Sequence, residues 1–118
     1  MSKPAVKICG IRTEAAIETL KLLPVDYVGF VFAKSRRQIT PERAAELSSL
    51  LKDGQLGERD EERPQTVGVF VNPKEAELAQ AVETAQLDCV QLHGSETADL
   101  CRRVKDEYGV RVIKVMSV

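Results

Sequence analysis

The chain has no tryptophan, few other aromatic residues and one histidine, His93. With aromatic residues at only 4%, it lacks the stacking platforms that single-stranded nucleic acids need. A formal net charge of −1 argues against a basic surface for phosphate backbones, so no nucleic-acid partner is expected. No apolar run approaches the roughly 20 residues that cross a bilayer, and no signal-peptide core is present. No membrane partner is therefore expected.

Cysteine is also scarce. The three cysteines, Cys9, Cys89 and Cys101, are odd in number and form no C-x-x-C pair. A single histidine does not complete a zinc site with them, and neither a metal nor a cofactor is expected. Free thiols without an export signal indicate a reducing compartment, so the expected location is the cytoplasm. The phosphate-binding patterns G-x-G-x-x-G and G-x-x-x-x-G-K-[ST] are absent, which leaves nucleotide binding without support.

What the sequence does contain is an alternation of short apolar runs and amphipathic segments. The runs are nearly continuous in apolar residues, which is typical of parallel strands buried on both faces. Strands are predicted at 5–11, 26–33, 65–72, 87–94 and 110–118. Helices are predicted at 13–23, 40–52, 72–85 and 95–109. The predicted N-caps are Thr13, Thr40, Asn72 and Ser95. Gly109 is the predicted C-terminal stop of the fourth helix.

Four βα units and a fifth strand predict a right-handed wound α/β architecture, in a single domain over 1–118. The absence of a helix after the fifth strand leaves two alternatives. One is a five-stranded, flavodoxin-like doubly wound module with a non-enzymatic binding or regulatory role. The other is the first half of a (β/α)8 TIM barrel, which usually needs about 200 residues or more. The long polar connection 53–65 is expected to be a surface loop on the face opposite the ligand site.

Polar and reactive residues follow the predicted strands, where parallel α/β folds bind their ligands. Cys9 ends the first strand and, by alternation, shares a strand face with Lys7. A nearby ammonium favours the thiolate form of a cysteine, which is the reactive one. Free cysteines are nevertheless among the most buried residue types, so a small core side chain is the alternative for Cys9.

Two further stretches are candidates for a binding site. The segment Lys34–Arg37 carries three cations in four residues, and arginine forks suit a carboxylate or phosphate. A solvated surface loop is the alternative for that segment. His93 shares its predicted strand face with Gln91, which places polar groups at a strand tip. A lone histidine is more often a satisfied structural residue than a catalyst, so its role stays open.

Taken together, the stretches KICGI, GFVFAKSRRQITPE, VGVFVN and VQLHG resemble the phosphoribosylanthranilate isomerases of tryptophan biosynthesis. The resemblance runs from the first to the fifth strand. It implies a (β/α)8 TIM barrel, of which this chain holds the first four βα units and strand five. It also implies an aldose–ketose isomerase, an intramolecular oxidoreductase without a cofactor. The implied Amadori rearrangement converts N-(5′-phosphoribosyl)anthranilate, a small phosphorylated substrate, into 1-(2-carboxyphenylamino)-1-deoxyribulose 5-phosphate.

The resemblance also assigns roles to single residues. The cysteine of the K-x-C-G motif, here Cys9, is the general base that removes the C2′ proton. The arginine of an S-P-R stretch binds the anthranilate carboxylate, and Arg37 matches it, with Arg36 in place of the proline. Gln91 and His93 of the Q-L-H-G motif are carried over as substrate-binding residues. Lys7 is expected to bind substrate beside Cys9.

Two parts of the family pattern have no counterpart in the 118 residues. The general acid is an aspartate in the segment after strand five, and the phosphate site belongs to glycine-rich turns after strands seven and eight. We therefore expect a fragment with little or no turnover of its own. Two unpaired sheet edges and an exposed inner face further predict self-association into a homo-oligomer.

Overall fold

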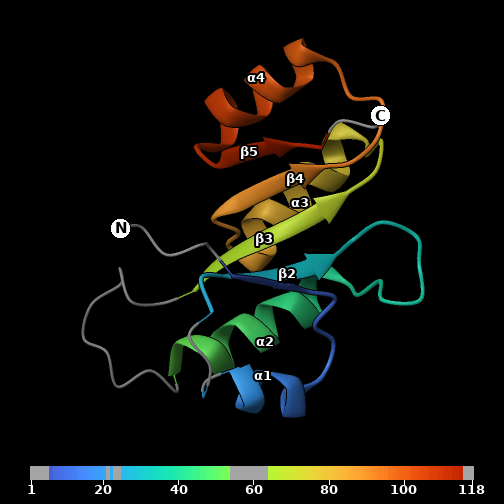
Figure 1. Ribbon diagram of the computed structural model, residues 1–118. Helices are drawn as coiled ribbons and strands as arrows, with labels where there is room; N and C mark the ends of the chain where they lie inside the picture. Colours follow the sequence, from blue (N-terminus) through green and yellow to red (C-terminus); the bar gives the residue numbers. More distant parts are fainter. Residues whose placement is uncertain (1–5, 21, 23–24, 54–63, 116–118) are drawn as a thin grey trace.

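The computed structural model describes residues 6–20, 22, 25–53 and 64–115, in which five strands form one parallel sheet (Figure 1). The elements are β1 (Lys7–Cys9), α1 (Glu14–Leu20), β2 (Tyr27–Val31), α2 (Pro41–Asp53), β3 (Gln65–Phe70), α3 (Glu75–Ala85), β4 (Cys89–Leu92), α4 (Ala98–Tyr108) and β5 (Arg111–Lys114). The strands lie in the sequential order β1-β2-β3-β4-β5. A flavodoxin-like sheet would place its first strand inside the sheet, so that alternative is wrong. The order is that of a TIM-barrel wall.

A contact across the inner face shows that this sheet is curved. Lys7 on β1 donates a hydrogen bond from Nζ to Oε1 of Gln91 on β4, although β2 and β3 lie between them. In a flat sheet three steps between strands span about 14 Å. Side chains also stand perpendicular to a flat sheet, which would keep the two groups apart. The strands therefore form an open barrel wall, with the helices on its outer side (Figure 1).

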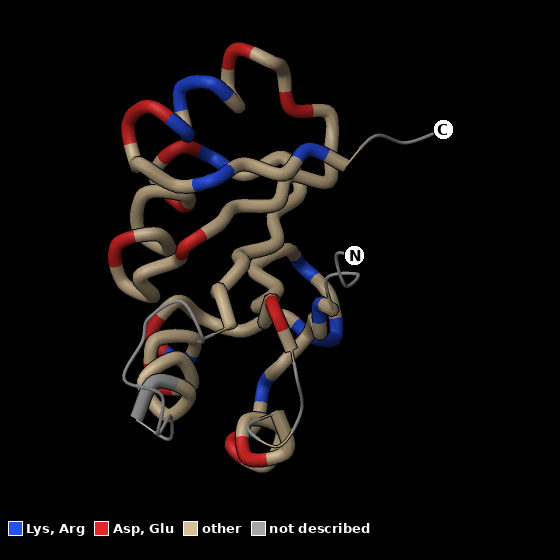
Figure 2. Tube along the Cα trace, turned by 60° about the vertical axis from the view of Figure 1, so that its left-hand side comes forward, with Lys and Arg blue, Asp and Glu red and all other residues tan. Residues whose placement is uncertain are grey.

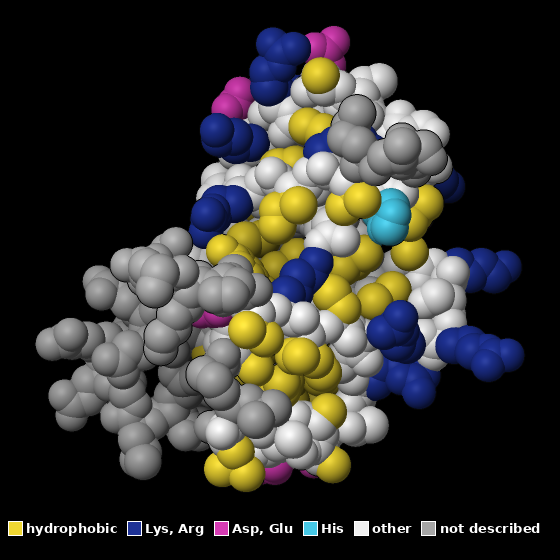
Figure 3. Space-filling view, viewed as in Figure 1, with side chains coloured by type: hydrophobic (Ala, Val, Ile, Leu, Met, Phe, Trp, Pro, Cys, Tyr) yellow, Lys and Arg dark blue, Asp and Glu magenta, His cyan; other side chains and the backbone are white. Residues whose placement is uncertain are grey.

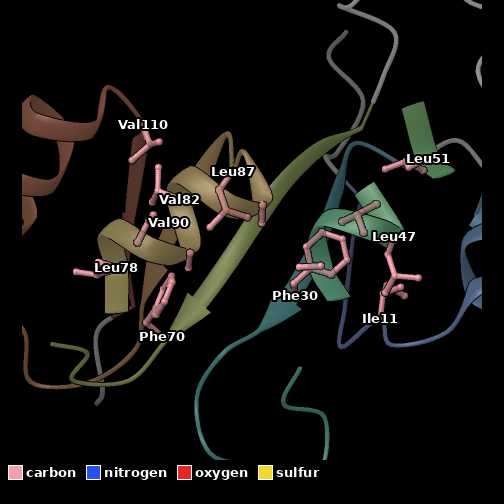
Figure 4. Close-up of a cluster of buried hydrophobic side chains, with 14 of the residues drawn as sticks. Ile11, Phe30, Leu47, Leu51, Phe70, Leu78, Val82, Leu87, Val90 and Val110 are labelled. Carbon is pink, nitrogen blue, oxygen red and sulfur yellow. The ribbon is translucent and has the colours of Figure 1, made fainter. Parts of the chain in front are cut away.

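The main core lies between the outer side of the sheet and the helices. On β2, Val28 and Phe30 point to this side and are fully buried, whereas Gly29 and Val31 alternate to the inner side. Figure 4 shows the same arrangement on neighbouring strands and helices, where the labelled core residues are Ile11, Phe30, Leu47, Leu51, Phe70, Leu78, Val82, Leu87, Val90 and Val110. Burial of these side chains holds the helices on the sheet.

Two aspartates fasten the amino-terminal ends of the strands. Asp26, just before β2, accepts the backbone N–H of Val6 at 2.7 Å. Asp88, just before β4, accepts the N–H of Thr66 at 2.9 Å and its hydroxyl at 3.2 Å. Each bond joins one strand to the preceding strand at the end opposite the usual ligand site. These contacts therefore fix the register where barrels keep their stabilising residues.

Charged residues lie mainly on the helices and the connecting loops, and most of the sheet is tan in Figure 2. Exposed pairs such as Arg102–Asp99, at 3.1 Å, are worth little to stability. None of the helices in the described ranges is long and apolar enough to cross a membrane.

The predicted helix signals are confirmed where they are local. Thr13 accepts the N–H of Ala16 at 3.1 Å, and Thr40 accepts the N–H of Arg43 at the same distance. Gly109 ends α4 in the left-handed conformation, with φ 64°. Most of the predicted loop, 54–63, and the end of the last strand, 116–118, lie outside the described residues.

The predicted cap of the third helix is wrong. α3 begins at Glu75, and its N-cap Lys74 makes no side-chain capping bond. Asn72 lies earlier, in the left-handed conformation with φ 46°. Its side chain is used elsewhere, because Asn72 Oδ1 accepts the backbone N–H of Ser95 at 2.8 Å.

The predicted cap of the fourth helix is also wrong. α4 begins at Ala98, and Thr97 caps it by accepting the N–H of Leu100 at 3.1 Å. Ser95 contributes its backbone N–H to the contact with Asn72 and lies two residues before the cap. The longer loop that results leaves room for a further side chain, Glu96, to turn back toward the sheet.

The cap assigned by the structure predicts that Thr97 contributes more to the free energy of unfolding than Ser95, two residues earlier. Thr97→Ala removes an acceptor from the first turn of α4 and should lower the free energy of unfolding by ~1 kcal/mol. Ser95→Ala, the matched control, should change it by only a few tenths. Urea denaturation followed by circular dichroism measures both. A larger loss for Ser95→Ala than for Thr97→Ala would contradict the assignment.

Candidate active site at the carboxyl ends of the strands

A cleft of about 590 Å³ opens on the inner face at the carboxyl ends of the strands. Figure 3 shows hydrophobic side chains gathered on this face, with basic side chains beside them. The lining residues are Cys9, Val31, Ala33, Lys34, Ser35, Arg36, Arg37, Val69, Val71 and Gln91. The cleft thus joins an apolar wall from β2 and β3 to a cationic rim and one thiol. Such a surface suits an anionic aromatic compound.

The Cys9 thiol reaches this cleft because its neighbour on β2 has no side chain. Cys9 pairs with Gly29 across the sheet, and a Cβ built at Gly29 would lie 2.6 Å from the Cys9 sulfur. The sulfur therefore occupies space that only glycine leaves open. Cys9 is half-buried and lines the cleft, so its thiol faces the inner side and not the helix-side core.

The other cysteines have different surroundings. Cys89 is 1% exposed on the inner face of β4, and its thiol donates to Gln65 Oε1 at 3.5 Å. Burial raises the pKa of the Cys89 thiol, and the positive charge of Arg111 only partly opposes this effect. Cys89 therefore stays protonated at neutral pH. Cys101 packs on the outer core from α4. In the described ranges, no cluster of His, Cys, Asp and Glu could hold a metal ion.

Arg37 lies directly over Gly10, next to Cys9. Gly10 has φ 83°, and a Cβ there would lie 2.5 Å from Arg37 Cδ and 2.8 Å from Nη1. Glycine thus permits both the turn after β1 and the close approach of the guanidinium. The loop after β2 is tied to this turn, because Arg12 Nη1 donates to the backbone carbonyl of Arg36. Arg36 and Arg37 are both exposed, and both line the cleft.

Lys7 and Gln91 meet across the inner face. The hydrogen bond from Lys7 Nζ uses the Oε1 acceptor of Gln91, so the amide nitrogen of Gln91 stays available as a donor toward the cleft. No hydrogen bond joins Lys7 to Cys9 among the residues that the structure describes. Lys7 therefore fixes Gln91 and places a positive charge on the inner wall.

Like Lys7, and unlike the other predicted site residues, His93 does not line the cleft. It follows the end of β4, is exposed, and donates its backbone N–H to the carbonyl of Phe70 at 2.9 Å. Its imidazole has no hydrogen-bond partner within the described part of the chain. The structure thus brings Cys9, Arg37 and Gln91 together, links Lys7 to Gln91, and leaves His93 on the outer rim.

Glu96, the most enclosed carboxylate of the rim, was not among the residues predicted from the sequence. Its side chain is 1% exposed. Oε1 accepts from the N–H of Gly94 at 2.8 Å and from Lys114 Nζ at 3.0 Å, and Oε2 accepts from the N–H of Asn72 at 2.8 Å. Burial raises the pKa of Glu96, but these hydrogen bonds outweigh burial and hold it below its usual range. In the sequence, Glu96 resembles an ordinary acidic residue of a first helical turn.

A curved sheet of successive parallel βα units, with a polar cleft at the carboxyl ends, defines the TIM-barrel class of α/β proteins. Comparison with known proteins agrees and is more specific. Residues 6–118 match the family model described as N-(5′-phosphoribosyl)anthranilate (PRA) isomerase. The chain belongs to this family.

Curated relatives carry the same name. The N-(5′-phosphoribosyl)anthranilate isomerase of Brevibacillus brevis is 39% identical over 113 residues, which cover 96% of this chain and 47% of the relative. The isomerase of a Streptococcus pneumoniae strain is 46% identical over 95 residues, covering 80% of this chain and 43% of the relative. The chain thus spans about half the length of the curated relatives that it matches.

Solved structures are similar over nearly the whole chain. Phosphoribosyl anthranilate isomerase from Thermotoga maritima superimposes with a TM-score of 0.80 at 36% identity, covering 98% of this chain and 52% of that one. A second isomerase structure has a TM-score of 0.79 at 37% identity and covers 98% of this chain and 55% of that one. That enzyme is in complex with reduced 1-(o-carboxyphenylamino)-1-deoxyribulose 5-phosphate.

Proposed function

We propose that this chain forms the part of a phosphoribosylanthranilate isomerase active site that binds the anthranilate end of the substrate and removes the C2′ proton. The observation that carries the proposal is the placement of the Cys9 thiol and the Arg37 guanidinium beside Gly10 in one cleft. Family membership supplies the reaction, and the cleft supplies groups that fit it. The proposed location is the cytoplasm, where a tryptophan-biosynthesis enzyme meets its substrate, and the proposed chemistry needs no cofactor.

The reaction is an internal redox exchange in which no atom is gained or lost overall. Protonation of the ribose ring oxygen breaks its bond to C1′ and leaves a Schiff base between C1′ and the anthranilate nitrogen. Cys9, as the thiolate, takes the proton from C2′, and the electrons of that C–H bond move toward the Schiff-base nitrogen. Protonation of C1′, together with loss of the proton from the C2′ hydroxyl, then gives the ketone at C2′. C1′ is thereby reduced and C2′ oxidised.

The remaining residues place the substrate for this step. Arg37 presents a planar fork that can hold the anthranilate carboxylate through two parallel hydrogen bonds. The aromatic ring would then lie against the apolar wall that contains Val31 and Val69. Gln91, fixed by Lys7, offers an amide donor to a substrate oxygen, and His93 approaches from the rim. The general acid and the phosphate site are proposed to come from outside residues 1–118.

The test combines the chain with the remainder of a relative. The part of the Brevibacillus brevis isomerase that follows the matched segment is co-produced with residues 1–118, and turnover is followed by loss of substrate fluorescence. The chain alone should turn over little, because a general acid contributes about 10²–10⁴-fold. The combined halves should restore turnover. A folded but inactive combination would refute the proposed function, and near-normal turnover by the chain alone would refute the placement of the acid.

In the combined enzyme, Cys9→Ser should lower kcat by about 10³-fold, because a serine hydroxyl does not ionise at neutral pH and so removes the base. Cys101→Ser is the matched control and should keep kcat within about twofold, since Cys101 lies on the helix side. Steady-state kinetics measures both variants. If Cys9→Ser kept a tenth of the activity, Cys9 would not be the base.

Two neighbouring arginines test the carboxylate site. Arg37→Ala should raise KM by about 10- to 100-fold, the effect of losing hydrogen bonds to a charged group. Arg36→Ala is the control and should change KM by less than about threefold, because the side chain that packs over Gly10 next to Cys9 is that of Arg37. A larger rise for Arg36→Ala would move the carboxylate contact to that residue.

We also propose that the chain self-associates through the free edges of β1 and β5 and the inner face of the sheet. Exposed apolar side chains occur at both edges, with Ile8 36% and Ile113 38% exposed. One solved structure is described as that of monomers generated from the dimeric isomerase of Thermotoga maritima, so that relative in its original form is a dimer. Unpaired parallel edges invite further pairing.

Size-exclusion chromatography with light scattering tests this self-association. The chain should elute with a mass above the 13.0 kDa of a monomer, and the mass should rise with concentration. Ile113→Lys places a charge on the β5 edge and should shift the population toward monomer. A monodisperse monomer at every concentration would count against the proposal.

A further inference from the structure

Three consecutive backbone N–H groups after β4 are each held by a separate acceptor. The N–H of His93 donates to the carbonyl of Phe70 at 2.9 Å, and the N–H of Gly94 donates to Glu96 Oε1 at 2.8 Å. The N–H of Ser95 donates to Asn72 Oδ1 at 2.8 Å. The path of the chain on both sides of His93 is therefore fixed one peptide group at a time.

Lys114 completes this arrangement from the end of β5. Its Nζ donates to the carbonyl of Gly94 at 2.5 Å and to Glu96 Oε1 at 3.0 Å. Both peptide groups of Gly94 are thus held by one ion pair, whose carboxylate is buried and whose ammonium is 25% exposed. A Cβ at Gly94 would lie 2.6 Å from Asn72 Oδ1, so this close packing also requires the glycine.

The backbone N–H of His93 is hydrogen-bonded, but its imidazole has no hydrogen-bond partner in the described ranges. No hydrogen bond in those ranges holds the ring, so its position depends on the conformation of the chain that carries it. Glu96 and Lys114 lie on the helix side of the rim and do not line the cleft of Cys9. Their influence on the cleft must therefore pass through the loop.

We propose that Glu96 is a positioning residue for His93, acting through the peptide groups of Gly94, with Lys114 as its partner. This inference rests on the proposed function, in which His93 contacts the substrate from the rim. Glu96 does not touch the substrate. It sets where the imidazole is placed relative to the mouth of the cleft.

Glu96→Gln is the most direct test because it keeps the shape and exchanges one acceptor for a donor. In the native loop, both carboxylate oxygens accept hydrogen bonds from N–H groups. Whichever way the amide of glutamine turns, its NH2 group faces the N–H of Asn72 or the N–H of Gly94. One of the two contacts is lost, and the loop loses its fixed path.

The readout is the imidazole of His93, which is the only histidine and so gives NMR signals that need no assignment. In Glu96→Gln the ring signals should move away from their wild-type positions and sharpen toward those of a mobile side chain. Asp99→Asn is the matched control, since it removes an exposed carboxylate of the same region, which among the described residues is paired only with Arg102. Its ring signals should coincide with those of the wild type. Unchanged ring signals in folded Glu96→Gln would overturn the inference.

A second variant covers the case in which Glu96→Gln does not fold. Lys114→Met removes the contact to the Gly94 carbonyl while leaving the carboxylate and its two backbone donors in place. It should also shift the His93 signals, and an unchanged spectrum from folded Lys114→Met would count against the positioning role of Glu96 and Lys114.

The pH dependence of stability gives a third readout. Hydrogen bonding holds the pKa of Glu96 below its usual value of about 4.3, so its stabilising effect is complete above that pH. The effect is lost as the pH falls through the lowered folded-state pKa. The difference in melting temperature between wild type and Glu96→Gln should therefore be largest near neutrality and shrink in acid. A difference that does not shrink in acid would contradict a stabilising role for the ionised Glu96 carboxylate.

Kinetics in the combined enzyme separates this inference from the proposed function. Glu96→Gln should raise KM by about tenfold with kcat nearly unchanged, as expected for a misplaced binding group. Inactive wild-type halves would refute the proposed function alone, because the NMR readout needs no turnover. An active wild type, with Glu96→Gln unchanged in both KM and the His93 signals, would refute the positioning role alone.

Discussion

Each strand of this sheet pairs in parallel with the strand that follows it in the chain, and the rest of the structure depends on that constraint. Parallel pairing in sequential order brings all carboxyl ends to one rim, so residues far apart in the chain become neighbours there. It also sends every connecting helix to the same side, which frees the inner face. The contact of Lys7 with Gln91, 84 residues later, is a direct result of the curvature that follows.

The inner and outer faces of the wall carry different kinds of side chain. The outer face is filled by aliphatic and aromatic groups that lock the helices in place. The inner face carries one accessible thiol, and its space is made by the missing side chain of Gly29. Gly10 does the same for the guanidinium of Arg37. The chemistry of the candidate site thus depends as much on two absent side chains as on the reactive groups.

Sequence alone could predict most of the fold, because strands and helices leave local signals. The caps Thr13 and Thr40 were predictable, since each bonds an amide three residues away. Asn72 and Ser95 were wrongly predicted as caps because they bond each other across two loops, a contact that no local pattern encodes. Glu96 was missed for the same reason, as its partners come from three different elements. The roles of Cys9, Arg37, Lys7, Gln91 and His93 stay predictions, although geometry groups four of them.

The aspartates at the amino-terminal ends of the strands have a consequence of a different kind. Asp26 and Asp88 each secure one strand to its predecessor, at the far end of the sheet from the thiol. The pairs β1–β2 and β3–β4 therefore share the same aspartate contact, as expected for a sheet built from repeated two-strand units. Substitutions near these aspartates therefore act on the stability of the sheet at a distance from the cleft, so stability and the candidate site can change independently in evolution.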